Sequence, residues 1–381
     1  MKRRFTATLK SLGLALALVA VSLRAQPVPL EGEVTDAAHP QLATAPDGAI
    51  HLVWQGRYAD SSVIAHRVWR DGAWGDEAII SASEGDQVHP ALAIGQDGTV
   101  HVAWAVRLQG RWAIAHSALR PGAGWGGLRI LSDPGAADSE FPAIAARSDG
   151  GADVVWQMAQ GTGHLLLHAS VDASGAAAPA APISAQRPDS YSVYPQVFLT
   201  PSPIVCWYEY QPRDGNFALR AAEQVPGPTW RRIPVDDLLL IDPNRLPYLV
   251  LSDVGIWAAL WHDAAPQRER VLLGIGGLPT LGEGTVVDAN PDFDNGSPQA
   301  AAIGPDGWAV TWRGETALGP EIYLSVPRPH GWQQHLLSEG LTPAAAQPAI
   351  TVSHDTVHVV WTSDVREGGN GRLTHGFVPL D

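Results

Sequence analysis

HPALAIGQDGTVHVAWAVRLQGRWAIAHSALRPGAGWGGLRILS, residues 89–132, decides how this chain is expected to fold. A short apolar segment (91–95) is followed by the turn residues QDG, by two further strand-like segments (99–106 and 111–119) and, after a glycine-rich stretch, by a last one (127–132). Alternating apolar and polar residues between Asp-Gly and Gly-rich turns are typical of antiparallel strands. The stretch therefore predicts a sheet of four short strands.

The same plan recurs along the chain. Seven copies align on a proline before the first strand, with spacings of 50 to 53 residues, at Pro40, Pro90, Pro142, Pro195, Pro247, Pro298 and Pro348. Each copy has a later tryptophan, at Trp54, Trp104, Trp156, Trp207, Trp261, Trp312 and Trp361. Repeats of this kind are typical of propeller blades around a central channel. We predict an all-β, seven-bladed propeller over residues 27–381 as one domain; a solenoid is the alternative, but it needs atypical capping repeats.

The two ends of the repeat region predict how the ring closes. The last repeat (348–381) has room for three strands, whereas VPLEGEVTDAAHP (28–40) precedes the first repeat. This segment aligns with the fourth-strand region IISASEGDQVHP (79–90). We expect residues 28–30 to form the outer strand of the seventh blade, an edge position where Pro29 is tolerated because a missing N–H costs little.

Composition excludes several functions. With 39 acidic and 25 basic residues the net charge is −14, so nucleic acid and anionic lipid are repelled overall. Both lysines, Lys2 and Lys10, lie near the N-terminus, so Schiff-base chemistry is excluded once that segment is removed. The single cysteine, Cys206, follows a strand-like run and precedes a repeat tryptophan. We expect it to be a buried apolar residue that forms no intrachain disulfide.

The N-terminus has the layout of a secretory signal peptide over residues 1–25. Basic residues precede an apolar run at 12–23, which is shorter than the ~20 apolar residues of a spanning helix. We expect cleavage near Ala25, with a cut after Ser22 or retention as a membrane anchor as alternatives. Cleavage predicts an exported protein, periplasmic or extracellular, without stable membrane insertion. Its net charge becomes −19, because residues 1–25 hold five basic residues and no acidic one.

The repeat resembles that of a known superfamily. Its order of proline, short strand, Asp-Gly turn, His-x-x-Trp strand and Ile-x-His strand is seen at Pro90, 96–98, 101–104 and 114–116. This pattern is similar to the propellers of secreted bacterial proteins of the sialidase-like, or BNR-repeat, superfamily, and it covers nearly all of residues 27–381. The resemblance implies a propeller. The Ser-x-Asp-x-Gly-x-x-Trp box and the six blades usual for true sialidases are not found, so sialidase activity is not implied.

Most of the conspicuous histidines recur at equivalent places in the repeat. Histidine stands three residues before the repeat tryptophan or in the third strand at His51, His101, His358, His66, His116, His168 and His375. His39 and His89 precede anchor prolines. Residues that recur from blade to blade are expected to pack or hydrogen-bond in the same way in each blade, and not to form one site. The repeat tryptophans are expected to pack between blades.

Functional residues of a propeller are expected on one face, where the loops between blades and between second and third strands converge. An aspartate precedes the anchor proline in most inter-blade loops, and we interpret it mainly as a turn cap. The loops after the repeat tryptophans differ from copy to copy. Their ligand-binding candidates are Arg57, Arg107, Tyr210, Arg313 and Glu315, and their catalytic candidates are Tyr208, Glu209, His262 and Asp263.

These residue types suit carbohydrate chemistry. Arginine forks hold a carboxylate or sulfate of an acidic sugar. A polysaccharide lyase needs such an arginine, a base such as His262 and a tyrosine as proton donor. A glycosidase needs two carboxylates, for which Glu209 and Asp263 are available.

One loop raises the question of calcium. Asp288, Asn290, Asp292 and Asp294 stand at every second position, as at the start of a calcium loop. The glycine and the glutamate that complete such a loop are replaced by Asn295 and Ala301. No cofactor is therefore required by the sequence, and calcium is the one cation it raises.

Two functions follow from these patterns. We expect an exported, monomeric propeller that binds a glycan or a protein without catalysis, because repeated blades without a recognised catalytic box offer a surface and no reaction centre. The alternative is a carbohydrate-active enzyme, a polysaccharide lyase or a sialidase-like glycosidase, with its site on the loops after the repeat tryptophans.

Overall fold

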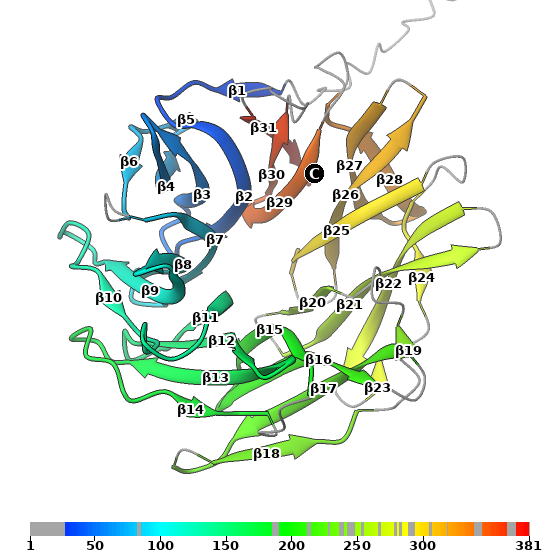
Figure 1. Cartoon of the computed structure of the whole chain (residues 1–381). Helices are drawn as coiled ribbons and strands as arrows, with labels where there is room; N and C mark the ends of the chain where they lie inside the picture. The colour runs from blue at the N-terminus through cyan, green and yellow to red at the C-terminus, as the bar shows by residue number, and fades with distance from the viewer. Residues whose placement is uncertain are drawn as a thin grey trace, which may run out of the picture.

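The computed structural model describes residues 27–81, 85–184, 190–211, 215–227, 229–235, 240–241, 248–252, 255–265, 268–277, 280–281, 284–288, 294–304, 307–317, 319–338, 345–363 and 371–380. These residues form seven antiparallel sheets around a central axis (Figure 1). The predicted all-β, seven-bladed propeller is confirmed. None of the described residues forms a helix that is long and apolar enough to cross a membrane. The expected signal peptide, residues 1–25, lies outside the described residues.

Blades 1 to 4 follow chain order, each from its inner strand outward. Blade 1 contains β2 (Thr35–Thr44), β3 (Ile50–Tyr58), β4 (Ser61–Arg70), β5 (Ala73–Trp74) and β6 (Ala78–Ile79). Blade 2 contains β7 (Gln87–Ile94), β8 (Val100–Leu108), β9 (Arg111–Leu119) and β10 (Arg129–Ile130). Blade 3 contains β11 (Ser139–Ala146), β12 (Ala152–Gln160), β13 (Gly163–Val171) and β14 (Ala181–Pro182). Blade 4 contains β15 (Ser192–Leu199), β16 (Pro203–Gln211), β17 (Asn216–Gln224), β18 (Trp230–Ile233) and β19 (Leu240–Ile241).

Blades 5 and 6 repeat this order, and blade 7 combines both ends of the chain. Blade 5 contains β20 (Tyr248–Leu251), β21 (Trp257–Ala265), β22 (Arg268–Gly277), β23 (Thr280–Leu281) and β24 (Thr285–Val286). Blade 6 contains β25 (Asp294–Ala302), β26 (Trp308–Thr316), β27 (Gly319–Arg328) and β28 (Gly331–Leu336). Blade 7 contains β29 (Ala346–Ser353), β30 (Thr356–Ser363), β31 (Arg372–Pro379) and, as its outer strand, β1 (Val28–Leu30).

The N-terminal segment closes the ring as predicted. β1 pairs with β31 in antiparallel register, with Val28 opposite His375. Beyond β1, the carboxylate of Glu77 in blade 1 accepts hydrogen bonds from the amides of Glu33 and Val34, both at 3.0 Å. The segment is thus bonded to blade 7 and to blade 1. The β1–β31 pairing lies within blade 7 and closes the ring, while residues 31–34 join blade 7 to blade 1 through the chain.

The core lies between blades. Seven clusters of buried apolar side chains each join two neighbouring blades. Trp104, for example, packs against Val53 and Ile64 of blade 1. The repeat tryptophans whose side chains are described are at most 2% exposed, namely Trp54, Trp104, Trp156, Trp207, Trp312 and Trp361. Their predicted packing between blades is confirmed, because a large apolar group at a strand centre fills the gap between two sheets.

The recurring histidines bond to one another within blades. His51 Nδ1 lies 3.0 Å from His66 Nε2 in blade 1. The same ring nitrogens are 3.2 Å apart in the His101–His116 pair of blade 2 and 3.0 Å apart in the His358–His375 pair of blade 7. Each pair joins the second strand to the third. The prediction that these residues hydrogen-bond equivalently is confirmed for blades 7, 1 and 2, whereas His168 of blade 3 bonds to Asp153.

Candidate functional site

A bulge marks the inner strands where they meet the channel. The pairing register with the second strand shifts next to the anchor proline in six blades. The residue before that proline has a left-handed backbone, with φ between 49° and 54°, at His39, His89, Phe141, Tyr194, Ser297 and Gln347. This conformation costs a non-glycine residue on the order of 1–3 kcal/mol, and a bulge re-orients the side chain at that position.

Glutamines of the preceding blade hold several of these bulges. The amide of His89 donates to Gln55 Oε1 at 2.8 Å. In the same way Gln347 Oε1 accepts from the amide of His39 at 2.9 Å, and Gln157 Oε1 accepts from that of Tyr194 at 3.2 Å. Because a bulge leaves a residue without its ladder partner, these side chains satisfy an otherwise orphaned N–H.

The residues at these bulges in blades 1 to 4 have ring side chains, and each ring contacts the ring of the next blade. The centroid distances are 5.2 Å between His39 and His89, 4.2 Å between His89 and Phe141, and 5.4 Å between Phe141 and Tyr194. The His89 and Phe141 rings are stacked, whereas the other two contacts are edge-to-face. We call these four residues the channel arc. They belong to the inner strands β2, β7, β11 and β15, which face the centre of the ring (Figure 1).

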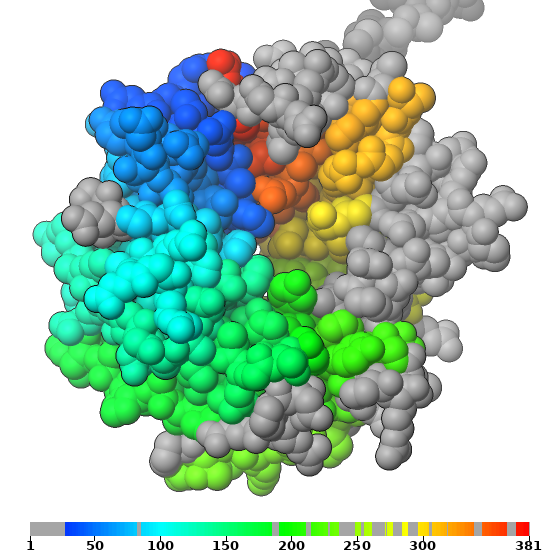
Figure 2. Space-filling view, viewed as in Figure 1, coloured from blue at the N-terminus to red at the C-terminus, as the bar shows by residue number. Residues whose placement is uncertain are grey.

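The channel arc is uncharged at neutral pH. Burial lowers the pKa of His39, and burial together with the neighbouring His39 lowers the pKa of His89 to about 4. Tyr194 at the end of the arc is 47% exposed. The space-filling view shows the molecule hollowed toward its centre (Figure 2). The exposed ring of Tyr194, at the end of this row of touching rings, is the arc's accessible surface for stacking.

Two predicted arginines lie at the rim on this side of the blades. Arg57 Nε is 3.9 Å from Asp36 Oδ2, and Arg107 Nη1 is 3.7 Å from Asp86 Oδ2. These side chains are about half exposed, at 43% to 57%. Exposed ion pairs contribute about 0–1 kcal/mol, so a ligand anion can replace either carboxylate at little cost. Asp36 and Asp86, two of the aspartates before the anchor prolines, thus pair with arginines near the ends of the second strands β3 and β8.

Two catalytic candidates of blade 4 are not part of the arc, although Tyr208 pairs across strands with Val193, the neighbour of Tyr194. Tyr208 is 3% exposed and belongs to the core between blades 4 and 5, and burial raises the pKa of its hydroxyl. It is part of strand β16 and not of the loop that follows, so alternation along the strand turns it to the face opposite Trp207. Glu209 lies 3.3 Å from Arg232 Nη2 and 3.9 Å from Arg220 Nε.

The remaining candidates are scattered over three blades. The Tyr210 ring contacts those of Tyr191 and Phe217, at 6.0 and 5.5 Å. Arg313 and Glu315 of β26 form an ion pair with each other. His262 and Asp263 lie in β21, paired with Val271 and Arg270, but their side chains lie outside the described residues. The structure therefore does not bring the predicted catalytic residues that it describes into one cleft.

The candidate calcium ligands are only partly described. Asp288 is 4% exposed, and its Oδ2 accepts a hydrogen bond from the amide of Val271 at 3.0 Å. Serines do the same in other blades, as Ser132 does for the amide of Ile114. Asn290, Asp292 and the side chain of Asp294 lie outside the described residues. Among the residues that the structure describes, no group of three His, Cys, Asp or Glu side chains is placed to hold a metal.

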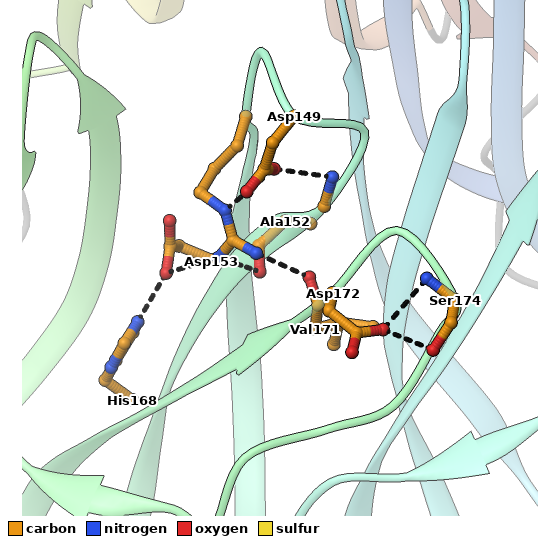
Figure 3. A network of polar contacts seen from close by, with 9 residues as sticks. Asp149, Ala152, Asp153, His168, Val171, Asp172 and Ser174 are labelled. Atoms are coloured by element: carbon orange, nitrogen blue, oxygen red, sulfur yellow. Dashed lines mark hydrogen bonds and ion pairs between the residues drawn. The ribbon is translucent and has the colours of Figure 1, made fainter.

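A buried polar network in blade 3 has catalytic residue types but no access. Asp153 Oδ1 lies 2.8 Å from His168 Nε2 and 3.3 Å from Arg147 Nη1 (Figure 3). Asp153 is 1% exposed, and the indole of Trp230 covers His168 at a centroid distance of 5.2 Å. A hydrogen-bonded aspartate and histidine orient one another in hydrolases, but a base must reach the substrate's proton. We assign this network to the stability of blade 3.

One acid beside the arc was missed in the sequence. Glu140 precedes Phe141 in β11, and its pKa is raised by burial and by the nearby carboxylate of Asp138. Asp138 Oδ1 in turn accepts a hydrogen bond from the backbone amide of Trp112 at 2.9 Å. The arc itself left a signal, because ring residues precede the anchor proline in four consecutive repeats. The left-handed bulge that aims them at the channel has no such signal.

Comparison with known proteins confirms the fold. No family model and no curated protein matches the chain. Among solved structures, a protein of unknown function from Dyadobacter fermentans is 14% identical, with a TM-score of 0.55 over 93% of this chain and 98% of the other. The polysaccharide lyase Uly1 is 9% identical, with a TM-score of 0.54 over 93% and 100% of the two chains.

A third neighbour comes from a bacteriophage. The endosialidase of phage phi92 is 7% identical, with a TM-score of 0.54 over 94% of this chain and 69% of its own. Similarity at these identities establishes a shared β-propeller fold and nothing about activity.

Proposed function

We propose that the protein is an exported propeller that binds a glycan without cleaving it, and that a sugar ring stacks on the channel arc. The observation that carries the proposal is the row of four touching rings, each on a left-handed backbone at a bulge. Such strain persists where the surrounding structure holds a ligand-facing group in place. Aromatic side chains give contact area with little loss of conformational entropy.

The rim supports the same ligand class. Arg57 and Arg107 form exposed, weak ion pairs with Asp36 and Asp86, each three residues before a histidine of the arc. A guanidinium that exchanges its aspartate for a carboxylate or sulfate on the glycan gains a bidentate bond. The arc then supplies contact area and the rim supplies selection for acidic sugars.

The test is glycan-array screening followed by calorimetry on the strongest hit. Tyr194→Ala and Phe141→Ala should each weaken binding by about tenfold, because a stacked ring contributes roughly 1 kcal/mol or more. Tyr58→Ala is the matched control: Tyr58 is exposed to 41%, close to the 47% of Tyr194, but it is not part of the arc. Equal losses in all three variants, or product release from the bound glycan, contradict the proposal.

The second candidate function is a carbohydrate-active enzyme, and Glu140 is the observation that favours it. A carboxyl group whose pKa is raised by burial and by a second carboxylate is the pattern of a general acid. If a polysaccharide is depolymerised, Glu140→Gln should abolish turnover and leave binding intact. Loss of binding in the same variant points to a structural role.

A further inference from the structure

A cavity between blades 2 and 3 lies at the end of β9 that is remote from the rim. It has a volume of about 270 Å³ and is lined by His116, Ala118, Arg120, Gly126, Gly127, Leu128, Arg129, Ser174 and Gly175. β9 runs from Arg111, next to the rim residue Arg107, to Leu119, and Arg120 follows directly. The cavity is thus on the opposite face of the blade from the channel arc and its rim.

The cavity exists because one blade has no tryptophan at a recurring position. The register places a tryptophan at the start of the outer segment in four blades, at Trp74, Trp125, Trp230 and Trp332. Trp74, Trp125 and Trp230 cover a histidine of the preceding blade, at 5.3, 5.0 and 5.2 Å. Blade 3 has Ala177 there, opposite Val171. A methyl group cannot reach the equivalent histidine of blade 2, His116, so the space beside it stays open.

Cationic groups converge on this space. Alternation along β9 puts His116, Ala118 and Arg120 on one face. Arg129 of β10 is the cross-strand partner of His116. Both guanidinium groups reach the same turn of blade 3: a Cβ on Gly175 would lie 3.4 Å from Arg129 Nε and 3.9 Å from Arg120 Nη2.

Neither arginine is neutralised by a described carboxylate. Arg120 donates to the carbonyl of Ala173, and Arg129 makes no hydrogen bond or ion pair with another described residue. Asp172 of the same turn is engaged by Ser174, whose amide and hydroxyl donate to it at 2.9 and 2.7 Å (Figure 3).

Blade 1 shows the balanced version of this site. Arg70 is the counterpart of Arg120, and it is paired with Asp47 at 2.7 Å. The counterpart of His116, His66, lies beneath Trp125. Blade 2 therefore differs from blade 1 in having an open space and two arginines without a carboxylate partner among the described residues. This positive site stands out in a protein whose net charge is −14.

We propose that the cavity between blades 2 and 3 binds a sulfate or phosphate group through Arg120 and Arg129. Two guanidiniums that approach each other from different strands repel until an anion lies between them. They donate from different directions, which suits an anion whose oxygens point to several sides. A second cavity of about 660 Å³ shares Arg120 and extends toward blade 1, which leaves room for the molecule that carries the group.

The experiment measures melting temperature against inorganic sulfate and phosphate at constant ionic strength, with chloride as the balancing salt. Sulfate also stabilises proteins unspecifically and without saturation, so the saturable part of the shift is the signal. Arg120→Gln and Arg129→Gln should each raise the sulfate concentration that gives half of this saturable shift by about tenfold or more. Ala177→Trp should abolish the shift by filling the cavity. Arg70→Gln, the matched control in blade 1, should leave it unchanged.

Further probes identify the source of the group. Tighter binding of glucose 6-sulfate than of inorganic sulfate indicates an anion carried by a sugar, and equal binding indicates a free anion; both support the site. Acetate should bind more weakly than sulfate. The proposal is overturned if no saturable shift of the melting temperature is found, or if acetate binds more tightly than sulfate. It is also overturned if Arg70→Gln weakens sulfate binding as much as Arg129→Gln does. Melting in chloride alone shows whether each variant folds.

Discussion

Blades 7, 1, 2 and 3 differ from blades 4, 5 and 6 at one pair of buried or partly buried positions on the second and third strands. In the first group the pair is polar: two histidines in blades 7, 1 and 2, and Asp153 with His168 in blade 3. In the second group it is apolar, formed by Ile204 and Ala221, Ala258 and Leu273, and Ala309 and Leu324.

The difference shows what this position requires. It accepts two polar partners or two apolar ones, and in no described blade does it hold one of each. A buried polar atom without a partner costs about 1–3 kcal/mol, whereas replacing both partners by apolar groups of similar shape is nearly neutral. The pairing rule, and not the identity of the residue, is what the blades have in common.

The largest expected effect is acid destabilisation of the polar half. Burial lowers the pKa of His51 and His358 to about 4 and that of His66 and His375 to about 3, from 6.5. Below pH 6.5 the unfolded chain binds protons that the folded pairs do not. Stability should therefore be complete above pH 6.5 and fall as the pH drops toward 4, on the order of 1 kcal/mol per pH unit for each imidazole. Urea unfolding at pH 7.5, 6 and 5 measures this loss.

A double variant sharpens the assignment of this pH dependence. His51→Ala with His66→Leu gives blade 1 the residue pair of blades 5 and 6, and its stability should fall less steeply with acid than that of the original protein. An identical slope in both proteins means that other groups cause the loss.

The next effect concerns the one carboxylate among these pairs. Asp153→Ala leaves Arg147, 23% exposed, and the buried His168 without their common partner. Breaking a buried ion pair from one side costs about 3 kcal/mol or more, so the urea midpoint should fall strongly at pH 7. Asp153→Asn keeps one acceptor and should cost less. If both variants unfold like the original protein, the network in Figure 3 does not stabilise blade 3.

The smallest effect is expected in the apolar half. Tyr208→Phe removes only a buried hydroxyl from the core between blades 4 and 5, so the free energy of unfolding should change by about 1 kcal/mol. Glycan binding should be unaffected, because Tyr208 is not part of the channel arc. A loss of ligand binding with unchanged stability would place Tyr208 in a functional site after all.

Particular residues show how far the sequence alone could reach. Apolar alternation and turn residues repeat at each anchor proline, so the blade count and the strand Val28–Leu30 could be predicted. The histidines could be assigned to the scaffold because they recur. The position of Tyr208 directly after Trp207 predicts a loop residue, whereas the structure places it in β16, facing the core between blades 4 and 5. Neighbouring residues of a strand point to opposite faces, so an error of one residue in the strand's end changes the environment of a side chain.

The sequence by itself determined the propeller, its seven blades and its closure by the two chain ends, because local periodicity is enough to specify strands and their repetition. Only the tertiary structure decided which side chains meet at the channel and at the cavity between blades 2 and 3. The channel arc depends on left-handed bulges in four blades. The cavity between blades 2 and 3 depends on Ala177 of blade 3, whose methyl group is too short to cover His116 of blade 2. Contacts between residues far apart in the chain create both features, and a local pattern such as the ring residues before four anchor prolines does not show where those side chains point.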